Sequence, residues 1–262
     1  MSRKKWLIIG IVSILFLLCL AINFFSSTQG IENNYLVELT DKVDPEIILI
    51  NIGDGDRASI ANLLLLIDSC KPVLIGVDAW FIGEKDSVRD TQLHAAFRII
   101  QNDILAYTLD SAGNPLYSNK NFRAWVSDEG LAWSESYNGL STDIIPIKLI
   151  NKEPHENFSL KIIKHWKPGF KHTLKLNEPI HIKFSRTLRQ FSHFEGSELR
   201  EKNVCEYLKN KVVLVGYIGP GNLDKHFTPI RHVKEYKDDE PDTYGLVIQA
   251  NAIRTILEYE KK

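Results

Sequence analysis

The chain has little cysteine, little methionine and no excess of charge of either sign. Its 262 residues include 3 Cys and 1 Met, and the formal net charge is −1. So few cysteines exclude a disulfide-dense miniprotein. The balanced charge argues against a nucleic-acid partner, because neutralising phosphates requires a concentrated basic face. With 44% hydrophobic residues, the chain can instead form a globular core.

Recognised catalytic and phosphate-binding motifs are also lacking. The sequence has no G-x-S-x-G nucleophile elbow, no H-E-x-x-H zinc motif and no Walker-type loop. Gly216, Gly219 and Gly221 follow a predicted strand, but their spacing and the intervening Pro220 differ from the dinucleotide-binding fingerprint. We therefore interpret these glycines as a tight turn, and we expect no enzyme activity, no metal site and no cofactor.

One long apolar run is present near the N-terminus. Residues 6–25 hold only two clearly polar side chains, and a helix of this length spans about 30 Å, the thickness of a bilayer's hydrocarbon core. Three basic residues precede the run, which favours a cytoplasmic N-terminus. The alternative is a cleaved signal peptide, although its apolar region is normally shorter, about 7–15 residues.

The predicted organisation follows from this run. We expect an inner or plasma membrane protein with a single span and its main domain outside the cytoplasm. The predicted parts are a cytoplasmic basic segment (1–5), a transmembrane signal anchor in contact with lipid (6–25), a juxtamembrane connector (26–43) and an extracytoplasmic domain (44–262).

Strand and helix patterns alternate at both ends of the exported region. Buried strands are predicted at 46–52, 73–77, 103–109 and 211–217, and helices at 58–70, 91–100, 197–208 and 244–260. Residues 111–195 lose the helical periodicity and predict short strands and long loops, as in the alternating stretch 179–184. We predict an α/β fold in which helices flank a mixed, largely parallel sheet, with an irregular β-rich middle segment and one preceding transmembrane helix.

Two of the cysteines lie in the exported region. Cys70 and Cys205 would be free to pair in an oxidising compartment, but spacing alone does not show that they approach each other. We interpret them as two small buried hydrophobic side chains and leave the pairing open.

Carboxylates gather at the predicted strand ends. Asp54 follows the first strand, Asp78 ends the second, and Asp224 follows the last one. In an open parallel sheet these ends border the crevice where ligands bind. Together with the nearby His226 and Thr228, these residues are the candidate ligand-binding set. The alternative is that these aspartates, and Asp56 beside Asp54, only cap helices and brace turns.

The C-terminal part carries a resemblance to a known family. The stretches KNKVVLVGYIGPGNLDKHFTPI (209–230) and PDTYGLVIQANAIRTIL (241–257) resemble the end of the type-2 CHASE domain. Asp44-Pro45 before the first strand, GVDAWF (76–81) and the spaced acids Asp86 and Asp90 are similar too. The resemblance covers roughly residues 40–258, and it is looser through the middle segment.

This resemblance implies an extracytoplasmic sensory domain of the kind associated with cyclases and histidine kinases. Its partners would be a small ligand or an envelope protein, and a downstream signalling protein. Members of the family usually continue into further membrane spans and an output domain, which this sequence lacks before Lys262. We therefore expect either a truncated chain or a stand-alone anchored sensor. The alternatives are a metal-dependent hydrolase using Asp54, Asp78, Asp224 and His226, and an envelope scaffold without a ligand.

Overall fold

The computed structural model describes residues 37–200, 203–233 and 240–259. The chain divides into two units, residues 1–37 and 38–262, and nearly all of the first unit lies outside the described residues. The predicted anchor at 6–25 and the basic segment before it are in that part. Within the described ranges, no helix combines the length and the apolar character needed to cross a bilayer.

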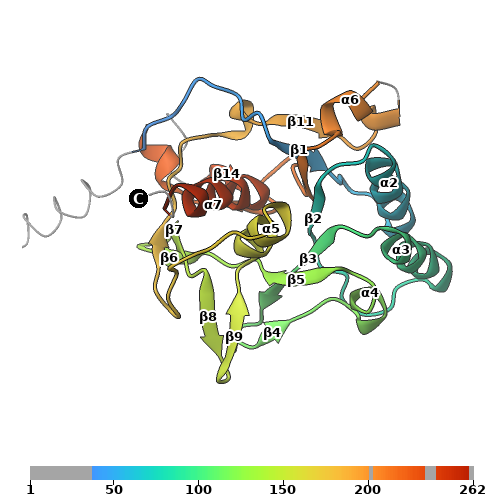
Figure 1. Ribbon diagram of the computed structural model, residues 1–262, viewed down its shortest axis with the longest axis horizontal. Helices are drawn as coiled ribbons and strands as arrows, with labels where there is room; N and C mark the ends of the chain where they lie inside the picture. The colour runs from blue at the N-terminus through green and yellow to red at the C-terminus, as the bar shows by residue number, and fades with distance from the viewer. Residues whose placement is uncertain (1–36, 201–202, 234–239, 260–262) are drawn as a thin grey trace, which may run out of the picture. The chain divides into compact units, whose positions relative to one another are not determined.

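A largely parallel sheet forms the centre of the second unit (Figure 1). Strand β12 lies between β1 and β2, although it comes from near the end of the chain. One short strand, β4 (Pro115–Leu116), pairs antiparallel with the end of β3. The parallel strands, in spatial order, are β11 (Ser192–Glu195), β1 (Ile47–Asn51), β12 (Val212–Gly216), β2 (Leu74–Asp78), β3 (Asp103–Leu109) and β5 (Asp128–Leu131).

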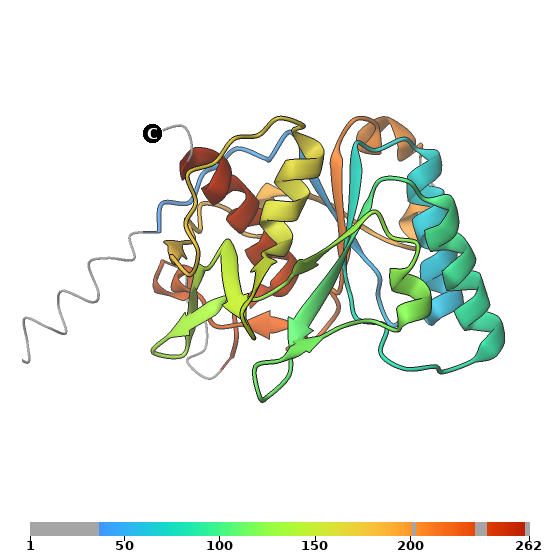
Figure 2. The ribbon, with the colours of Figure 1, turned by 60° about the horizontal axis from the view of Figure 1, so that its bottom comes forward.

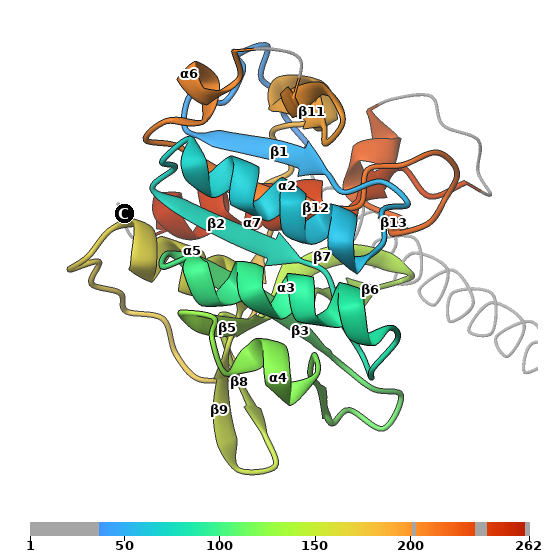
Figure 3. The same ribbon diagram turned by 90° about the vertical axis from the view of Figure 1, so that its right-hand side faces the viewer.

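Helices cover both faces of this sheet. Figure 2 shows α2 (Arg57–Ser69) and α3 (Ser87–Ile99) on one side and α5 (Phe158–Trp166) and α7 (Gly245–Tyr259) on the other. Figure 3 looks onto the face that α2 and α3 cover. The central strands β1 and β12 are buried along their whole length and consist almost entirely of apolar residues, which is typical of a parallel sheet covered on both faces.

The alternation along β2 shows how the two faces are filled. Ile75 and Val77 pack into the core under α2 and α3, where the rings of Phe81 and Phe97 also lie. Gly76 points to the opposite face, and a Cβ there would come within 2.7 Å of Ile162 on α5. The glycine therefore permits α5 to approach the sheet closely.

Shorter elements complete the fold. The short helices are α4 (Lys120–Arg123) and α6 (Cys205–Leu208), and 3-10 turns occupy Leu188–Gln190, Glu198–Arg200 and Pro229–His232. One small antiparallel sheet joins β6 (Glu135–Tyr137), β7 (Leu140–Ile144) and β10 (Ile180–His181). Two hairpin-like pairs are β8 (Ile147–Ile150) with β9 (Glu153–Glu156), and β13 (Lys225–His226) with β14 (Thr243–Tyr244).

The structure corrects three sequence-based predictions about the fold, and it contains one helix that the sequence analysis did not predict. The helix predicted at 197–208 is wrong: the described residues there form only the turn at Glu198–Arg200 and the short helix α6. The strand expected over 179–184 is reduced to β10. Helix α5 was not predicted, although Asn157 caps it by accepting a hydrogen bond from the Ser159 amide, 2.9 Å away.

The third correction concerns the cysteines. Cys70 and Cys205 form a disulfide that joins the end of α2 to α6, with 4.5 Å between their Cα atoms. The interpretation as two unpaired hydrophobic side chains is therefore wrong. The pairing depends on how β12 and the segment before it return to the sheet, and residue spacing does not reveal that.

Candidate functional site

A cavity of about 230 Å³ opens at the carboxyl edge of the sheet, on the side of α5 and α7. We call it the Asp78 cavity. Strands β2, β3 and β5 end at it, and the first turns of α7 form a wall. This is the edge at which open α/β sheets bind ligands. The lining residues are Asp78, Trp80, Thr108, Ala132, Trp133, Ser134, Ser136, Ser141, Asp224, His226, Gly245, Ile248 and Gln249.

Asp78 is the last residue of β2, and its side chain enters the cavity. Among the described residues, no hydrogen bond or ion pair reaches its carboxyl group. Burial raises the pKa of Asp78 to about 7, and repulsion from Asp224 adds to the effect, while His226 opposes it. The carboxyl group therefore changes charge near neutral pH.

Asp224 is held at the cavity by the start of α7. Its backbone is in the left-handed region (φ 58°), and its carbonyl oxygen accepts a hydrogen bond from the Gly245 amide, 2.8 Å away. A Cβ at Gly245 would lie 3.0 Å from both carboxylate oxygens of Asp224, a tight contact that glycine avoids. His226 stands at the more exposed rim, with its Nε2 3.8 Å from the Asp224 carboxylate.

The remaining lining is polar and aromatic. Three serines from the middle segment contribute hydroxyl groups, and the Ser134 and Ser141 hydroxyls lie 3.3 Å apart. Trp80 and Trp133 supply the aromatic part of the lining. The buried indole N–H of Trp133 has no acceptor among the described residues. The cavity therefore offers acids, hydroxyl groups and aromatic surface in a small volume.

A comparison with known families decides the classification. The model of the CHASE2 domain matches residues 37–262. The chain belongs to the CHASE2 domain family. No curated protein and no solved structure matched it. CHASE2 domains are sensory domains, and the domain itself is not catalytic. The resemblance noted in the sequence is thus confirmed.

Three of the segments that carry the CHASE2 resemblance meet at the Asp78 cavity. GVDAWF (76–81) supplies Asp78 and Trp80, and the segment after β12 supplies Asp224 and His226. The third segment forms α7 and adds Gly245, Ile248 and Gln249 to the wall. Three stretches that are far apart in the sequence therefore build one site.

Of the five predicted site residues, the structure brings Asp78, Asp224 and His226 together. Thr228 does not line the cavity: it is fully buried, and its hydroxyl contacts Asp242 and the Thr243 hydroxyl. Asp54 is an exposed residue of the turn after β1 and lines none of the cavities described here. Asp56 has the expected structural role, because its carboxylate accepts the Ser59 amide at the start of α2 (2.8 Å).

Sequence reasoning missed the serines and the aromatic residues of the cavity. Trp80 stands inside the GVDAWF stretch, so its proximity to Asp78 was a usable signal. Ser134, Ser136 and Ser141 come from the irregular middle segment, where no periodic pattern places a residue in space. They reach the cavity only through the β6–β7 hairpin.

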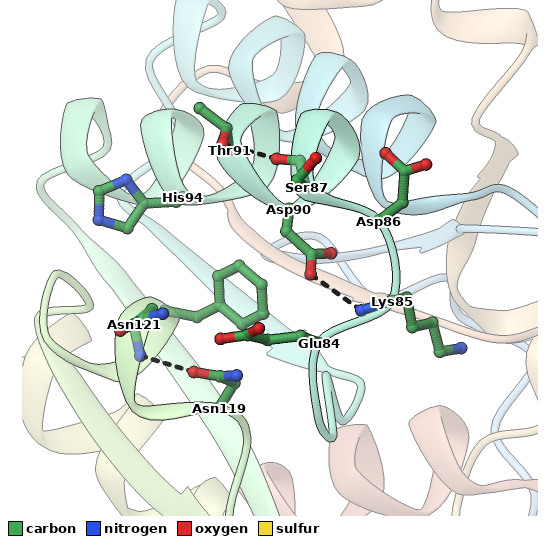
Figure 4. A pocket seen from close by; sticks show the side chains of 10 residues that line it. Glu84, Lys85, Asp86, Ser87, Asp90, Thr91, His94, Asn119 and Asn121 are labelled. Atoms are coloured by element: carbon green, nitrogen blue, oxygen red, sulfur yellow. Dashed lines mark hydrogen bonds between the residues drawn. The ribbon is translucent and has the colours of Figure 1, made fainter.

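A larger cavity of about 500 Å³ lies beside the start of α3 (Figure 4). Two of its three acids have protein partners, and the third, Glu84, is exposed. Asp86 caps α3 by accepting two amides of the first turn, and Asp90 accepts from the Lys85 amide and from Arg57, 2.6 Å away. Arg57 is buried and also donates to the carbonyl groups of Ile82 and Gly83. Asp86 and Asp90 therefore hold the loop between β2 and α3 in place.

A third cavity, of about 340 Å³, lies where β1 and β11 end. Asn51 is one of its lining residues. Its side chain donates a hydrogen bond to Glu195 (2.7 Å) and accepts hydrogen bonds from the Gly53 and Ile218 amides. Across the described ranges, no three His, Cys, Asp or Glu side chains come together in a way that could hold a metal ion. Of these three cavities, the Asp78 cavity is the one lined by a partly buried carboxyl group that has no hydrogen bond or ion pair among the described residues.

Proposed function

We propose that this CHASE2 chain is a membrane-anchored extracytoplasmic sensor that binds a small ligand in the Asp78 cavity. The observation that carries the proposal is the convergence of the three family-like segments on this one cavity. Residues 6–25 would anchor the domain, with the N-terminus in the cytoplasm. Ligand binding would favour one packing of the domain and bias a downstream signalling protein.

Helix α7 is the proposed connection between the cavity and the anchor. Its first turns line the cavity, and Arg254 in its second half holds the residues that lead into β1. Arg254 donates to both carboxylate oxygens of the fully buried Asp44 and to Glu46, 2.9 Å away. A movement at the cavity end of α7 would therefore be felt at residues 44–46, which lie just after the juxtamembrane connector.

The chemistry of Asp44 supports a stable contact at this end. Burial alone would raise its pKa, but the hydrogen bonds from Arg254 and from the Glu46 and Ile47 amides lower the pKa below its usual value. The carboxylate is thus charged throughout the neutral range and stays paired with Arg254. The contact is fixed enough to transmit a displacement of the helix.

The disulfide supports the proposed compartment. A bond between Cys70 and Cys205 persists in the periplasm or outside the cell, whereas reducing systems in the cytosol oppose it. The positive segment before residue 6 favours the same orientation. A reporter that is active only in the cytosol, fused after Lys262, is expected to stay silent. A strong signal from it would refute this orientation.

A ligand screen on the full-length chain tests the sensor proposal. Small metabolites are added to the detergent-solubilised protein, and a ligand of the native state is expected to raise its Tm. Replacing Ser136, an exposed lining residue, by Trp should fill the cavity and abolish that shift. The control Asn62→Trp, at an exposed position on α2, should keep it.

Two outcomes would overturn the proposal. Hits that stabilise Ser136→Trp as well as the parent chain would place binding elsewhere. A screen without hits, with both tryptophan variants folded, would favour an envelope scaffold that has no ligand. The metal-dependent hydrolase has no supporting observation among the described residues.

A further inference from the structure

We infer that the Asp78 cavity takes a small organic cation, an amine or a quaternary ammonium compound. This inference names the ligand class of the proposed sensor site and rests on that proposal. It is carried by three features of the cavity: its charge, a carboxyl group without a partner, and its aromatic lining.

The charge of the lining is the first feature. The lining residues include two carboxyl groups, from Asp78 and Asp224, and none of them is Lys or Arg. The only basic lining side chain is His226, which stands at the partly exposed rim beside Asp224. The walls formed by β3, β5 and α7 contribute only uncharged residues. An anionic ligand would meet repulsion here, and a cation would meet attraction.

The missing partner of Asp78 is the second feature. Several other buried or partly buried acids of the described chain have their own cation: Asp44 has Arg254, Asp90 has Arg57, and Asp128 has Lys161. Asp103 has no cation, but one of its carboxylate oxygens accepts hydrogen bonds from the Ser127 amide and hydroxyl. Asp78 has no such partner within the described ranges, yet its side chain sits deep enough to be desolvated. A buried ionised carboxylate needs a paired charge. A bound cation would supply it.

The aromatic surface and the volume are the third feature. Trp80 and Trp133 border the same space as the two acids, and tryptophan is the side chain that attracts organic cations best. A cavity of 150 Å³ holds benzene, so this one, at about 230 Å³, has room for roughly ten non-hydrogen atoms. The serine hydroxyls would accept hydrogen bonds from an ammonium group. Acid, indole and hydroxyl together favour an organic cation over a bare metal ion.

Three four-carbon probes of equal length test the charge. They are 1,4-diaminobutane, the neutral 1,4-butanediol and the anion succinate, each added to the full-length chain, with tetramethylammonium as a second cation. We expect the cations to raise Tm and the diol and succinate to leave it unchanged. Asp78→Asn should weaken diamine binding at least tenfold. Asp54→Asn removes an exposed acid that lines none of the described cavities, and it should change nothing.

The pH dependence gives an independent readout. If binding requires ionised Asp78, the affinity for the diamine should fall about tenfold for each pH unit below 7 in the parent chain. In Asp78→Asn this part of the pH dependence should be lost. A general loss of folding in the variant would also abolish a cooperative melting transition, so the two causes are separable in the same experiment.

The outcomes separate the ligand class from the sensor function. Equal binding of diol and diamine, or diamine binding that survives in Asp78→Asn, would overturn the cation inference and leave a ligand-binding cavity in place. Failure of both cations to stabilise the parent chain at millimolar concentration would also overturn it. Whether the cavity binds any ligand is then decided by the screen with the Ser136→Trp variant.

Discussion

Asp78→Asn should make the ligand-free domain more stable at pH 8 than the parent chain. The carboxyl group lies in a cavity that disfavours its charge, and burial raises its pKa to about 7, some three pH units above the ordinary aspartate value of 3.8. Each unit corresponds to about 1.4 kcal/mol, so the full penalty approaches 4 kcal/mol at pH 7 and above. Because the residue is only partly buried, we expect about half of this, roughly 2 kcal/mol.

The sign of the pH dependence follows from proton binding. Between about pH 4 and pH 7 the folded state holds a proton on Asp78 that the unfolded state has lost, so the free energy of unfolding falls as the pH rises. Asparagine removes this fall. The advantage of the variant should therefore be near zero at pH 4 and should reach its maximum at pH 7 and above.

Thermal unfolding of both proteins at pH 5 and pH 8 measures the effect. A gain of 2 kcal/mol raises Tm by roughly 4–8 °C in a domain of this size. The exposed Asp54→Asn variant should stay within about 0.5 kcal/mol of the parent chain at both pH values. Equal stability of Asp78→Asn and the parent chain at pH 8, or a loss at both pH values, would refute the desolvation of this carboxyl group.

Three further predictions concern the frame around the cavity. Arg254→Ala leaves the buried Asp44 with only its longer contact to Arg186 (3.5 Å) and should lower the free energy of unfolding by about 3 kcal/mol in urea titrations, whereas a loss below 1 kcal/mol would contradict a tight ion pair. Reducing the Cys70–Cys205 disulfide, which spans 135 residues, should lower the free energy of unfolding by up to about 5 kcal/mol and lower Tm accordingly. The Tm of the Cys205→Ser variant should no longer respond to reductant. Gly130→Ala places a Cβ 2.5 Å from the backbone of α5 and should lower the free energy of unfolding by about 1–3 kcal/mol; an unchanged Tm would disprove that contact.

The sheet and its covering helices were largely predictable from the sequence. The apolar strand predicted at 103–109 coincides with β3, and the predictions for β1, β2, β12 and α7 differ from the structure by one residue at each end. These elements can be predicted because burial on both faces of the sheet requires continuous apolar runs in its central strands. Helix α3 begins four residues earlier than predicted, because Asp86 caps a polar first turn that has no apolar face.

The prediction of one helix over 197–208 failed because the spacing of apolar residues was taken as evidence for a continuous helix. Leu199, Val204 and Leu208 are buried as their spacing suggests, but they belong to separate short turns and not to one continuous helix. The spacing reports burial and does not report backbone continuity. In the cavity, the strand-end rule predicted the region of Asp78 and Asp224. It gave no information on which loops fold back over them.

The central position of β12 also determines when the domain can form. Strand β12 is synthesised well after β1 and β2, and these two strands pair with each other only through β12. Contacts that close so long a stretch of chain form slowly. Until β12 has been synthesised, the nascent chain therefore exposes the apolar side chains and the unpaired edges of β1 and β2. A chaperone would need to shield this surface. The parallel sheet can therefore close only after residue 216 has been synthesised.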